Sequence, residues 1–314
     1  MRRILRFAAF ALLAVVVAGV VYGLLREPAS GPRPAPGPFP EDSGYTRVDD
    51  PPEELSLATW NLRWLNRPGR GEVDRSPADF RRLARVAEAV DADVVAVQEV
   101  YDRRALERVF DPKVYAFYLS RRWAKQRTGF VVKRGLTVER HDDYRRLAAV
   151  GGGDRRGVDL SLQLSGGALR LLSIHLSSGC IREEGVPATN PDCRDLLEQA
   201  KRLGDWIRRR EEAGEEFAIL GDFNRDYAEG DPIWSELERA ASRVGTSLVR
   251  AGRGESPSCW DARYPTYIDH LVFDADVTED WQIGSFEETT YESVLESREG
   301  ELSDHCPLAV TLKR

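Results

Sequence analysis

The 314-residue sequence lacks several features that would place it in a familiar class. It has no excess of positive charge: its formal net charge is −7, which argues against a protein whose overall field holds DNA or anionic lipid, although a local basic path stays compatible. Its four cysteines show no C-x-x-C pair and no zinc-ligand spacing, so a cysteine-based zinc site is excluded. No internal repeat is present, which excludes a solenoid.

The N-terminus holds a long hydrophobic run. Three arginines among the first six residues precede residues 7–25, nineteen residues without a charge. As a helix this run spans about 28 Å, close to the hydrocarbon thickness of a bilayer. Because the arginines come first, we expect this end to stay in the cytoplasm and the rest to be exported, to a periplasmic or extracellular location.

Residues 1–26 therefore predict an uncleaved transmembrane helix. No A-x-A site stands directly before Arg26, and no cysteine follows the run, which argues against a lipid-anchored precursor. A signal peptide whose cleavage releases a secreted protein is the alternative. Residues 27–52 are rich in Pro and Gly and predict an extended linker. Residues 53–314 are long enough for one large α/β domain with its own core.

Hydrophobic periodicity in this domain predicts strands mixed with helices. Because many strands follow one another directly, we expect an α+β fold of two packed sheets with helices outside, and not a Rossmann-type sheet. Helices are expected at residues 77–90, with Ser76 as N-cap, and 194–212. Strands are expected at 55–60, 93–98, 115–119, 130–133, 158–164, 169–175, 217–220, 267–273 and 307–312.

Several of these strands end in polar residues that an apolar pattern does not require, and strand ends at a sheet edge are a common place for a site. Carboxylate and amide oxygens are hard ligands that suit Mg²⁺, Mn²⁺ or Ca²⁺ rather than zinc. Histidines can move protons near neutral pH. Phosphoester hydrolysis needs both kinds of group. The oxygen ligands are Asn61, Glu99, Asp222 and Asp304, and the histidines are His175 and His305.

The order of these motifs resembles the endonuclease/exonuclease/phosphatase superfamily, which includes deoxyribonuclease I-like metal-dependent phosphodiesterases. The resemblance covers residues 55–314 and rests on TWNLRWLN, VVAVQEV, QRTGF, LLSIHLSSG, ILGDFN, YIDHLVF and LSDHCPL. It implies a four-layer α/β sandwich with the site at one rim. It also implies that Asn61 and Glu99 hold the metal, with Asp304 in or near its coordination shell. The expected ion is Mg²⁺ or Mn²⁺, with Ca²⁺ as a candidate second ion.

The resemblance also implies catalytic roles. Asp222 would orient or deprotonate the attacking water, and Asn224 and His175 would donate to the phosphoryl oxygens. Asp269 would orient His305, which acts on the phosphate or accepts a proton. Since family members differ in the base they use, Asp222 and His305 share that assignment.

Two positions depart from the family pattern. Arg63 stands where repair-type members carry an acidic residue, which fits a deoxyribonuclease I-like arrangement better. Gln126 stands where a glutamate supports the first histidine. An amide oxygen there can still accept from His175 but does not stabilise an imidazolium as a carboxylate does, which argues against a general-acid role for His175. Arg156, or Arg155 beside it, resembles a phosphate-contacting arginine, and a solvated turn is the alternative.

One further histidine, His270, directly follows Asp269. Successive residues of a strand point to opposite faces, so we expect His270 to be structural.

The substrate is less defined. Residues 121–127 (RRWAKQR) combine basic residues with a tryptophan, a pattern that can follow a nucleic-acid backbone and stack a base. A solvated face beside a core tryptophan is the alternative. Nucleic acid is thus the expected substrate, and a lipid or small phosphoester is the main alternative. A non-catalytic binding module on the same fold is a third. Nothing implies a protein partner.

The predicted export determines the expected oxidation state of the four cysteines. In an oxidising compartment they would form two disulfides, and in a reducing one four thiols. Four cysteines allow three pairings that sequence does not decide. We favour Cys180–Cys193, which closes one loop, and Cys259–Cys306, which ties the Asp269 segment to His305.

Overall fold

The computed structural model describes residues 53–70, 72–150, 155–164, 167–181, 185–187, 189–259, 266–295 and 302–313. The predicted transmembrane helix (residues 1–26) and linker (residues 27–52) lie outside these ranges. Within them, no helix is long and apolar enough to cross a membrane.

The described chain forms two six-stranded mixed sheets. Each sheet has one parallel pair, β1 with β2 and β7 with β8, and its other pairs are antiparallel. The first sheet has the order β11 (Gln282–Glu288), β12 (Leu308–Lys313), β1 (Glu54–Leu65), β2 (Val94–Val100), β4 (Arg127–Lys133), β3 (Tyr115–Leu119). The second has the order β5 (Thr137–Arg140), β6 (Val158–Leu164), β7 (Gly167–His175), β8 (Phe217–Asp222), β10 (Asp269–Asp274), β9 (Leu248–Arg250).

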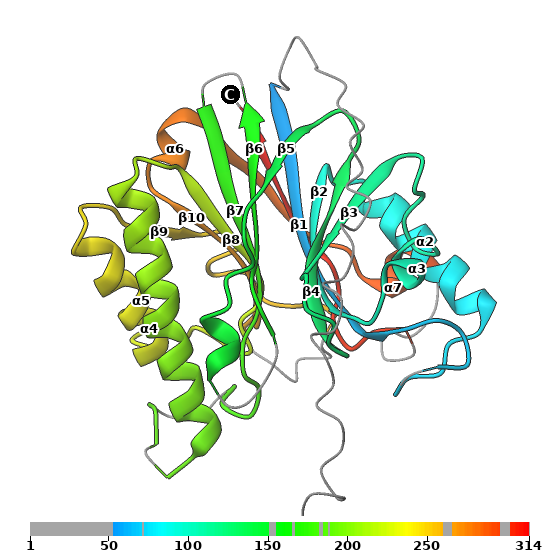
Figure 1. Cartoon of the computed structure of the whole chain (residues 1–314), viewed down its shortest axis with the longest axis horizontal. Coiled ribbons are helices and arrows are strands. Elements are labelled where there is room, and N and C mark those ends of the chain that lie inside the picture. The colour runs from blue at the N-terminus through cyan, green and yellow to red at the C-terminus, as the bar shows by residue number, and fades with distance from the viewer. Residues whose placement is uncertain are drawn as a thin grey trace, which may run out of the picture. The chain divides into compact units, whose positions relative to one another are not determined.

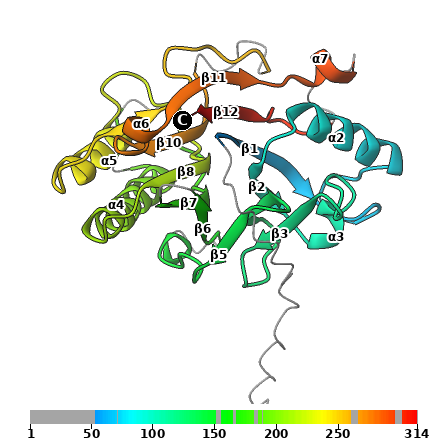
Figure 2. The ribbon, with the colours of Figure 1, turned by 90° about the horizontal axis from the view of Figure 1, so that it is seen from above.

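The sheets pack face to face and helices cover their outer faces, as Figures 1 and 2 show. The expected two-sheet sandwich is therefore observed. Outside the first sheet lie α2 (Pro77–Val90), α3 (Arg103–Leu106) and α7 (Tyr291–Leu295), and outside the second lie α4 (Pro191–Glu212) and α5 (Pro232–Ser242). Shorter elements are η1 (Leu147–Ala149) and α6 (Val277–Asp280).

Side-chain alternation along the strands builds three apolar layers. In β1, Leu57 faces the second sheet while Trp60 faces the helices, and in β8, Leu220 faces the first sheet while Ile219 faces α4 and α5. Because the period of a strand is two, every second residue of each strand belongs to the layer between the sheets. A polar residue of that parity at a strand end must lie at the rim of this layer.

The helix boundaries follow their capping residues. Ser76 caps α2 with a full capping box to Asp79, and Asp91 ends the helix in a left-handed conformation at φ 41°. The helix expected at residues 77–90 is confirmed. The second expected helix begins three residues earlier than predicted, at Pro191, because the side chain of Asn190 accepts from the first backbone N–H groups.

Both favoured disulfide pairings are present. Cys180 is bonded to Cys193 across a sequence separation of 13, and Cys259 to Cys306 across 47, with Cα–Cα distances of 5.0 and 6.0 Å. The first bond fixes the loop after β7 to the first turn of α4. The second holds the segment that carries His305, next to Cys306, against the chain before β10.

Replacing Cys180 and Cys193 together by Ser should lower the free energy of unfolding by about 3 kcal/mol, because the unfolded chain regains the entropy that the closed loop removes. Chemical denaturation of the oxidised protein measures the change. The Cys259–Cys306 bond closes a longer loop, so replacing both of these cysteines by Ser should lower the free energy of unfolding by at least as much. After reduction, both double variants and the wild-type protein should have the same stability. Equal stability of oxidised and reduced wild-type protein would contradict this prediction.

Candidate active site

Asp222, the last residue of β8, lies at the rim where the two sheets meet. Its side chain has the parity of Leu220 and is 1 % exposed. Oδ2 accepts a hydrogen bond from Asn61 Nδ2 of the first sheet at 2.9 Å, and it lies 3.4 Å from His175 Nε2 and 3.8 Å from His305 Nε2. One carboxylate oxygen therefore joins groups from both sheets.

Strand register puts three of the predicted residues in one row. His175 of β7 is paired with Asp222 of β8, and Asp222 is paired in turn with Asp269 of β10. Gly221 makes this close pairing possible, because its φ is 152° and a Cβ there would overlap with the carbonyl oxygen of Ile174. Asp222 is thus held between an imidazole and a second carboxylate.

His305 reaches this row from the chain before β12. Its Nδ1 donates to Asp269 Oδ2 at 2.6 Å, and its carbonyl oxygen accepts from Tyr291 Oη at 2.9 Å. The neighbouring Ser303 donates from Oγ to the carbonyl oxygen of Asn61 at 2.7 Å. Helix α7 and strand β1 of the first sheet therefore fix the backbone around His305, and the second sheet orients its imidazole.

Irregular backbone at two strand ends turns side chains into the site. Val95 and Val97 face the helices, and regular alternation would send Glu99 the same way, but Glu99 has φ 58° and the register shifts between Val97 and Val100. As a result Glu99 Oε1 lies 3.8 Å from His175 Nε2. Such bulges and left-handed residues commonly re-aim side chains beside active sites.

The end of β1 is distorted in the same way. Arg63 and Trp64 have φ values of 41° and 53°, and the Trp64 N–H donates to Glu99 Oε2 at 3.0 Å. Asn224, at φ 52°, continues the pattern after β8, where its N–H donates to Asp222 Oδ1 at 2.8 Å and its Nδ2 to the Leu176 carbonyl oxygen at 3.0 Å. Strained backbone is thus concentrated on residues that hold the two carboxylates.

Arg75, which the sequence did not single out, stabilises the distorted end of β1. Its side chain is 2 % exposed, and Nη2 donates to the carbonyl oxygens of Leu62, Arg63 and Leu302 at 3.0, 2.7 and 2.5 Å. It therefore links the chain after Asn61 to the chain before Asp304. An isolated arginine between two elements carries no sequence signal for this role.

The oxygen donors fit a divalent cation. Glu99 and Asn61 belong to the same cluster as Asp222, and Asn61 Oδ1 accepts from the Arg63 N–H at 2.9 Å. Carboxylate and amide oxygens suit Mg²⁺ or Mn²⁺. The ligand atoms of Asp222, Asp269 and His305 also lie within 4.8 Å of one another. The 2.6 Å hydrogen bond to Asp269 occupies His305 Nδ1 and leaves Nε2, so this cluster is a second candidate position for the ion beside Glu99 and Asn61. Asp304 is placed at the solvent edge: its carboxylate lies 3.8 Å from Arg63 Nε and is 52 % exposed.

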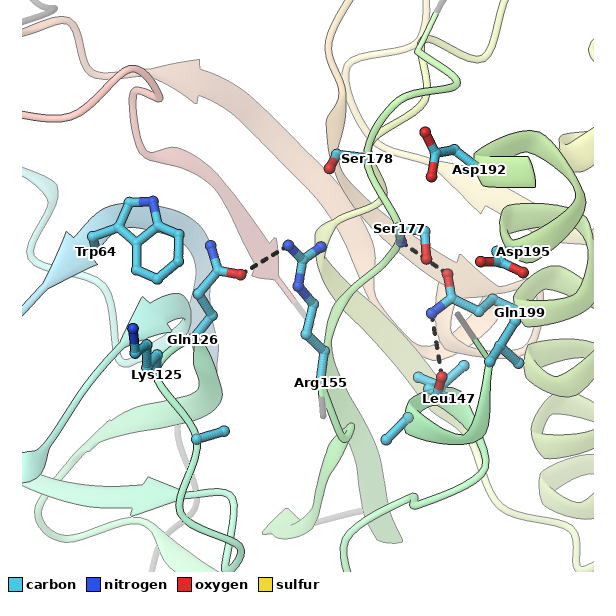
Figure 3. Close-up of a pocket in the computed structure, with 13 residues that line it drawn as sticks. Trp64, Lys125, Gln126, Leu147, Arg155, Ser177, Ser178, Asp192, Asp195 and Gln199 are labelled. Atoms are coloured by element: carbon cyan, nitrogen blue, oxygen red, sulfur yellow. Dashed lines mark hydrogen bonds between the residues drawn. The ribbon is translucent and has the colours of Figure 1, made fainter. Parts of the chain in front are cut away.

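A cavity of about 310 Å³ opens beside this cluster, with Gln126 and Arg155 at its centre (Figure 3). Arg155 donates to the carbonyl oxygen of Leu176 at 2.7 Å and to Gln126 Oε1 at 2.9 Å. Of the two adjacent arginines, Arg155 lines the cavity, whereas the carbonyl oxygen of Arg156 accepts from Thr128 Oγ1. Both arginines stand in the loop before β6, where no strand alternation tells which side chain enters the cavity, so only a structure could distinguish them.

Gln126 does not support His175 in the way the sequence suggested. Its amide oxygen accepts from Arg155, and His175 Nδ1 is buried without a hydrogen-bond partner among the described residues. The cause is the arginine itself, since a guanidinium offers a stronger, charge-assisted hydrogen bond than a neutral imidazole. Gln126 therefore orients the candidate phosphate-binding arginine.

The buried groups carry different charges at neutral pH. Burial lowers the pKa of His305, but the carboxylates of Asp269 and Asp222 outweigh this and raise it to about 10. Burial, together with Asp269, raises the pKa of Asp222 to about 7. Burial, Arg155 and His305 hold the pKa of His175 well below its usual value. His305 is thus protonated, His175 is neutral, and Asp222 titrates near neutrality.

His270 lies on the opposite face of β10, as its parity predicted. Its Nε2 lies 2.9 Å from the carbonyl oxygen of Arg225, and its ring stacks on Tyr227 with centroids 4.7 Å apart. Burial lowers the pKa of His270 to about 3. It is a neutral packing residue between β10 and the loop after β8.

Comparison with known proteins identifies the family. The model of the Endonuclease/Exonuclease/phosphatase family matches residues 58–305. No functionally curated protein matches the sequence.

Solved structures with the same fold include TDP2 from C. elegans, with a TM-score of 0.59 and 19% identity over 83% of this chain and 75% of that chain. D. rerio TDP2 complexed with single strand DNA product has a TM-score of 0.55 and 16% identity, over 83% of this chain and 99% of that chain. The endonuclease domain of TRAS1, a telomere-specific non-LTR retrotransposon, has a TM-score of 0.53 and 17% identity, over 83% of this chain and 98% of that chain. At these identities the likeness concerns the fold.

Asp269→Asn should lower the pKa of His305 from about 10 toward the ordinary histidine value of about 6.5, because the neutral amide no longer stabilises the imidazolium. NMR titration of the imidazole Cε1–H signal measures it. Asp142→Asn, at a surface carboxylate paired with Arg121, is the control and should leave the titration unchanged. An unaltered His305 pKa in Asp269→Asn would show that Asp269 does not set its charge.

Proposed function

Since the chain belongs to the endonuclease/exonuclease/phosphatase family, we propose that it hydrolyses phosphodiester bonds with the help of a divalent metal ion and that its substrate is nucleic acid. The observation that carries the proposal is the position of Asp222, within 4 Å of an amide and two imidazoles from three other segments. A buried carboxylate beside donors and oxygen ligands is what in-line attack of water on a phosphate requires.

The protonation states assign different roles to the two candidate bases, His305 as the proton donor and Asp222 as the proton acceptor. His305, with a pKa near 10, carries a proton at neutral pH and donates it to a phosphoryl or leaving oxygen. Asp222 is the acceptor for the proton of the attacking water. Its pKa of about 7 makes it a stronger base than an ordinary carboxylate, and Asn61 and the Asn224 N–H orient it.

Other residues bind the phosphate. Arg155 lies in the cavity beside Asp222 and Glu99, whose charges oppose the fall in its pKa that burial causes. Its fixed guanidinium suits a phosphoryl oxygen. Asn224 and His175 are the proposed neutral hydrogen-bond donors to the phosphoryl oxygens. A divalent ion at Glu99 and Asn61, with Asp304 at the edge of its surroundings, would polarise the phosphoryl group and offset its charge.

Several features favour nucleic acid over lipid. The related fold of D. rerio TDP2 was solved with a single strand DNA product, and that of TRAS1 is an endonuclease domain. In the described part of this chain, the exposed large hydrophobic side chains are Val114 and Trp123. Two separate side chains make no apolar patch of the kind that enters a bilayer. The −7 net charge restricts phosphate binding to the local cations of the cavity.

We also propose that the reaction takes place outside the cytoplasm. The arginine-led hydrophobic run of residues 7–25 and the two disulfides both support export. Whether the segment anchors the protein or is cleaved changes where the enzyme is held and leaves the catalytic groups unchanged.

Metal removal provides the first test. EDTA should abolish hydrolysis of a plasmid or oligonucleotide, and Mg²⁺ or Mn²⁺ should restore it. Glu99→Gln should weaken Mn²⁺ binding, measured by calorimetry, and lower the rate, because it removes a charge from the cation's surroundings. Glu212→Gln, at an exposed carboxylate of α4 paired with Arg208, is the control for overall charge. Full activity in chelator would disprove the mechanism.

A second test ranks the catalytic residues. Replacing Asp222, Asn224 or His305 by Ala should lower kcat about 10²-fold or more, the usual size for a lost acid–base group or transition-state donor. His270→Ala should lower the rate per folded molecule far less, although it should destabilise the protein. Active-site titration with circular dichroism separates the two effects. An essential His270 beside a dispensable His305 would show that the site is assigned to the wrong face of β10.

A further inference from the structure

A second cavity of about 430 Å³ adjoins the catalytic one and has no role in the mechanism above. It is lined by Trp64, Asn66, Arg70, Glu72, Tyr101 and Lys125. Trp64 and Lys125 line both cavities. The two spaces therefore meet at these side chains, beside the candidate metal ligand Glu99.

Trp64 is tied to the catalytic cluster through its backbone. Its N–H donates to Glu99 Oε2 at 3.0 Å, and its left-handed φ of 53° turns the residue out of the strand. Figure 3 shows the indole at the edge of the catalytic cavity, on the same side as Gln126. A flat group that extends from a phosphate at Arg155 toward this side would reach the indole.

Two more aromatic residues continue this surface. The Tyr101 N–H donates to the carbonyl oxygen of Leu65 at 2.8 Å, which places Tyr101 beside the end of β1. The Tyr101 ring meets Trp123 edge to face, with centroids 5.1 Å apart and an interplanar angle of 86°. Trp123 is 60 % exposed, the most exposed large hydrophobic side chain in the described ranges. Fixed aromatic rings that stay open to solvent next to a phosphate site suit a stacking ligand.

The charged residues differ between the two sides of the phosphate site, the far wall of the catalytic cavity and the aromatic cavity. The far wall of the catalytic cavity carries Asp192 and Asp195, which repel further phosphates (Figure 3). The aromatic cavity adds Arg70, while Lys125, which lines both cavities, is paired with Glu72, the one acidic group among the lining residues of the aromatic cavity. A polyanion is therefore favoured on the aromatic side.

We propose that Trp64, with Tyr101 and Trp123 extending its surface, stacks an unpaired nucleobase next to the phosphate that is hydrolysed. The inference rests on the proposed nucleic-acid hydrolysis and adds a specificity to it. Bases inside a duplex are already stacked on one another and would have to leave the helix to reach the indole. The preferred substrate is thus single-stranded or locally unpaired nucleic acid.

The test compares a single-stranded oligonucleotide with the same oligonucleotide whose bases are replaced by abasic residues, and with its duplex. Wild-type kcat/KM should be about tenfold or more higher for the base-containing strand, the size of one lost base stack. Trp64→Leu should bring this ratio close to one, and Trp64→Phe should keep most of it, since both variants retain the backbone N–H to Glu99. Val114→Ala changes the other exposed hydrophobic residue and should keep the wild-type ratio.

Binding of the same strands in EDTA, by fluorescence anisotropy, separates this inference from the proposed function. Base-dependent binding that Trp64→Leu abolishes, without any hydrolysis in Mg²⁺ or Mn²⁺, would overturn the hydrolytic function and support the stacking site. Hydrolysis with equal kcat/KM for base-containing and abasic strands, or an unchanged ratio in Trp64→Leu, would overturn the stacking site alone.

Discussion

The arrangement of the site depends on one buried carboxylate, Asp222, which must interact with both sheets. The layer between the sheets is apolar along its length, so a charged group there is tolerated only at the rim and only with partners. Asn61 provides a hydrogen bond from the first sheet, and His305 provides a positive charge that Asp269 maintains. The hydrogen bond from Asn61 and the charge of His305 both lower the pKa of Asp222, so losing either would let burial raise that pKa further.

The irregular parts of the fold serve this constraint. Regular strands would direct Glu99 away from the rim, and the left-handed residues at the ends of β1 and β2 redirect it. Arg75 compensates part of their cost by binding the carbonyl oxygens of Leu62 and Arg63, which lie where the register of β1 shifts, and it also binds that of Leu302. The Cys259–Cys306 bond holds the neighbouring chain, so that the segment bearing His305 does not depend on strand pairing alone.

The sequence predicted the residues of the site better than their contacts. Polar residues at strand ends identified Asn61 and Asp222, the family resemblance implied the role of Asp269, and strand parity separated His270 from Asp269. Edge strands β5 and β11 were missed because their alternation is weak and largely exposed. Helix α5 was missed although Asp231 and Pro232 carry its N-terminal signals.

Partner choice among neighbouring side chains was the part that sequence could not decide. Gln126 was expected beside His175 and binds Arg155 instead, because the energies of competing hydrogen bonds depend on three-dimensional placement. The same limit applies to Asp222. Burial and Asp269 bring its pKa to about 7, whereas positive charge near Glu99 and Asn61 would lower it. With a cation held by Glu99 and Asn61, Asp222 would be ionised in a larger fraction of molecules and would be a weaker base, so metal binding would affect how well Asp222 accepts a proton.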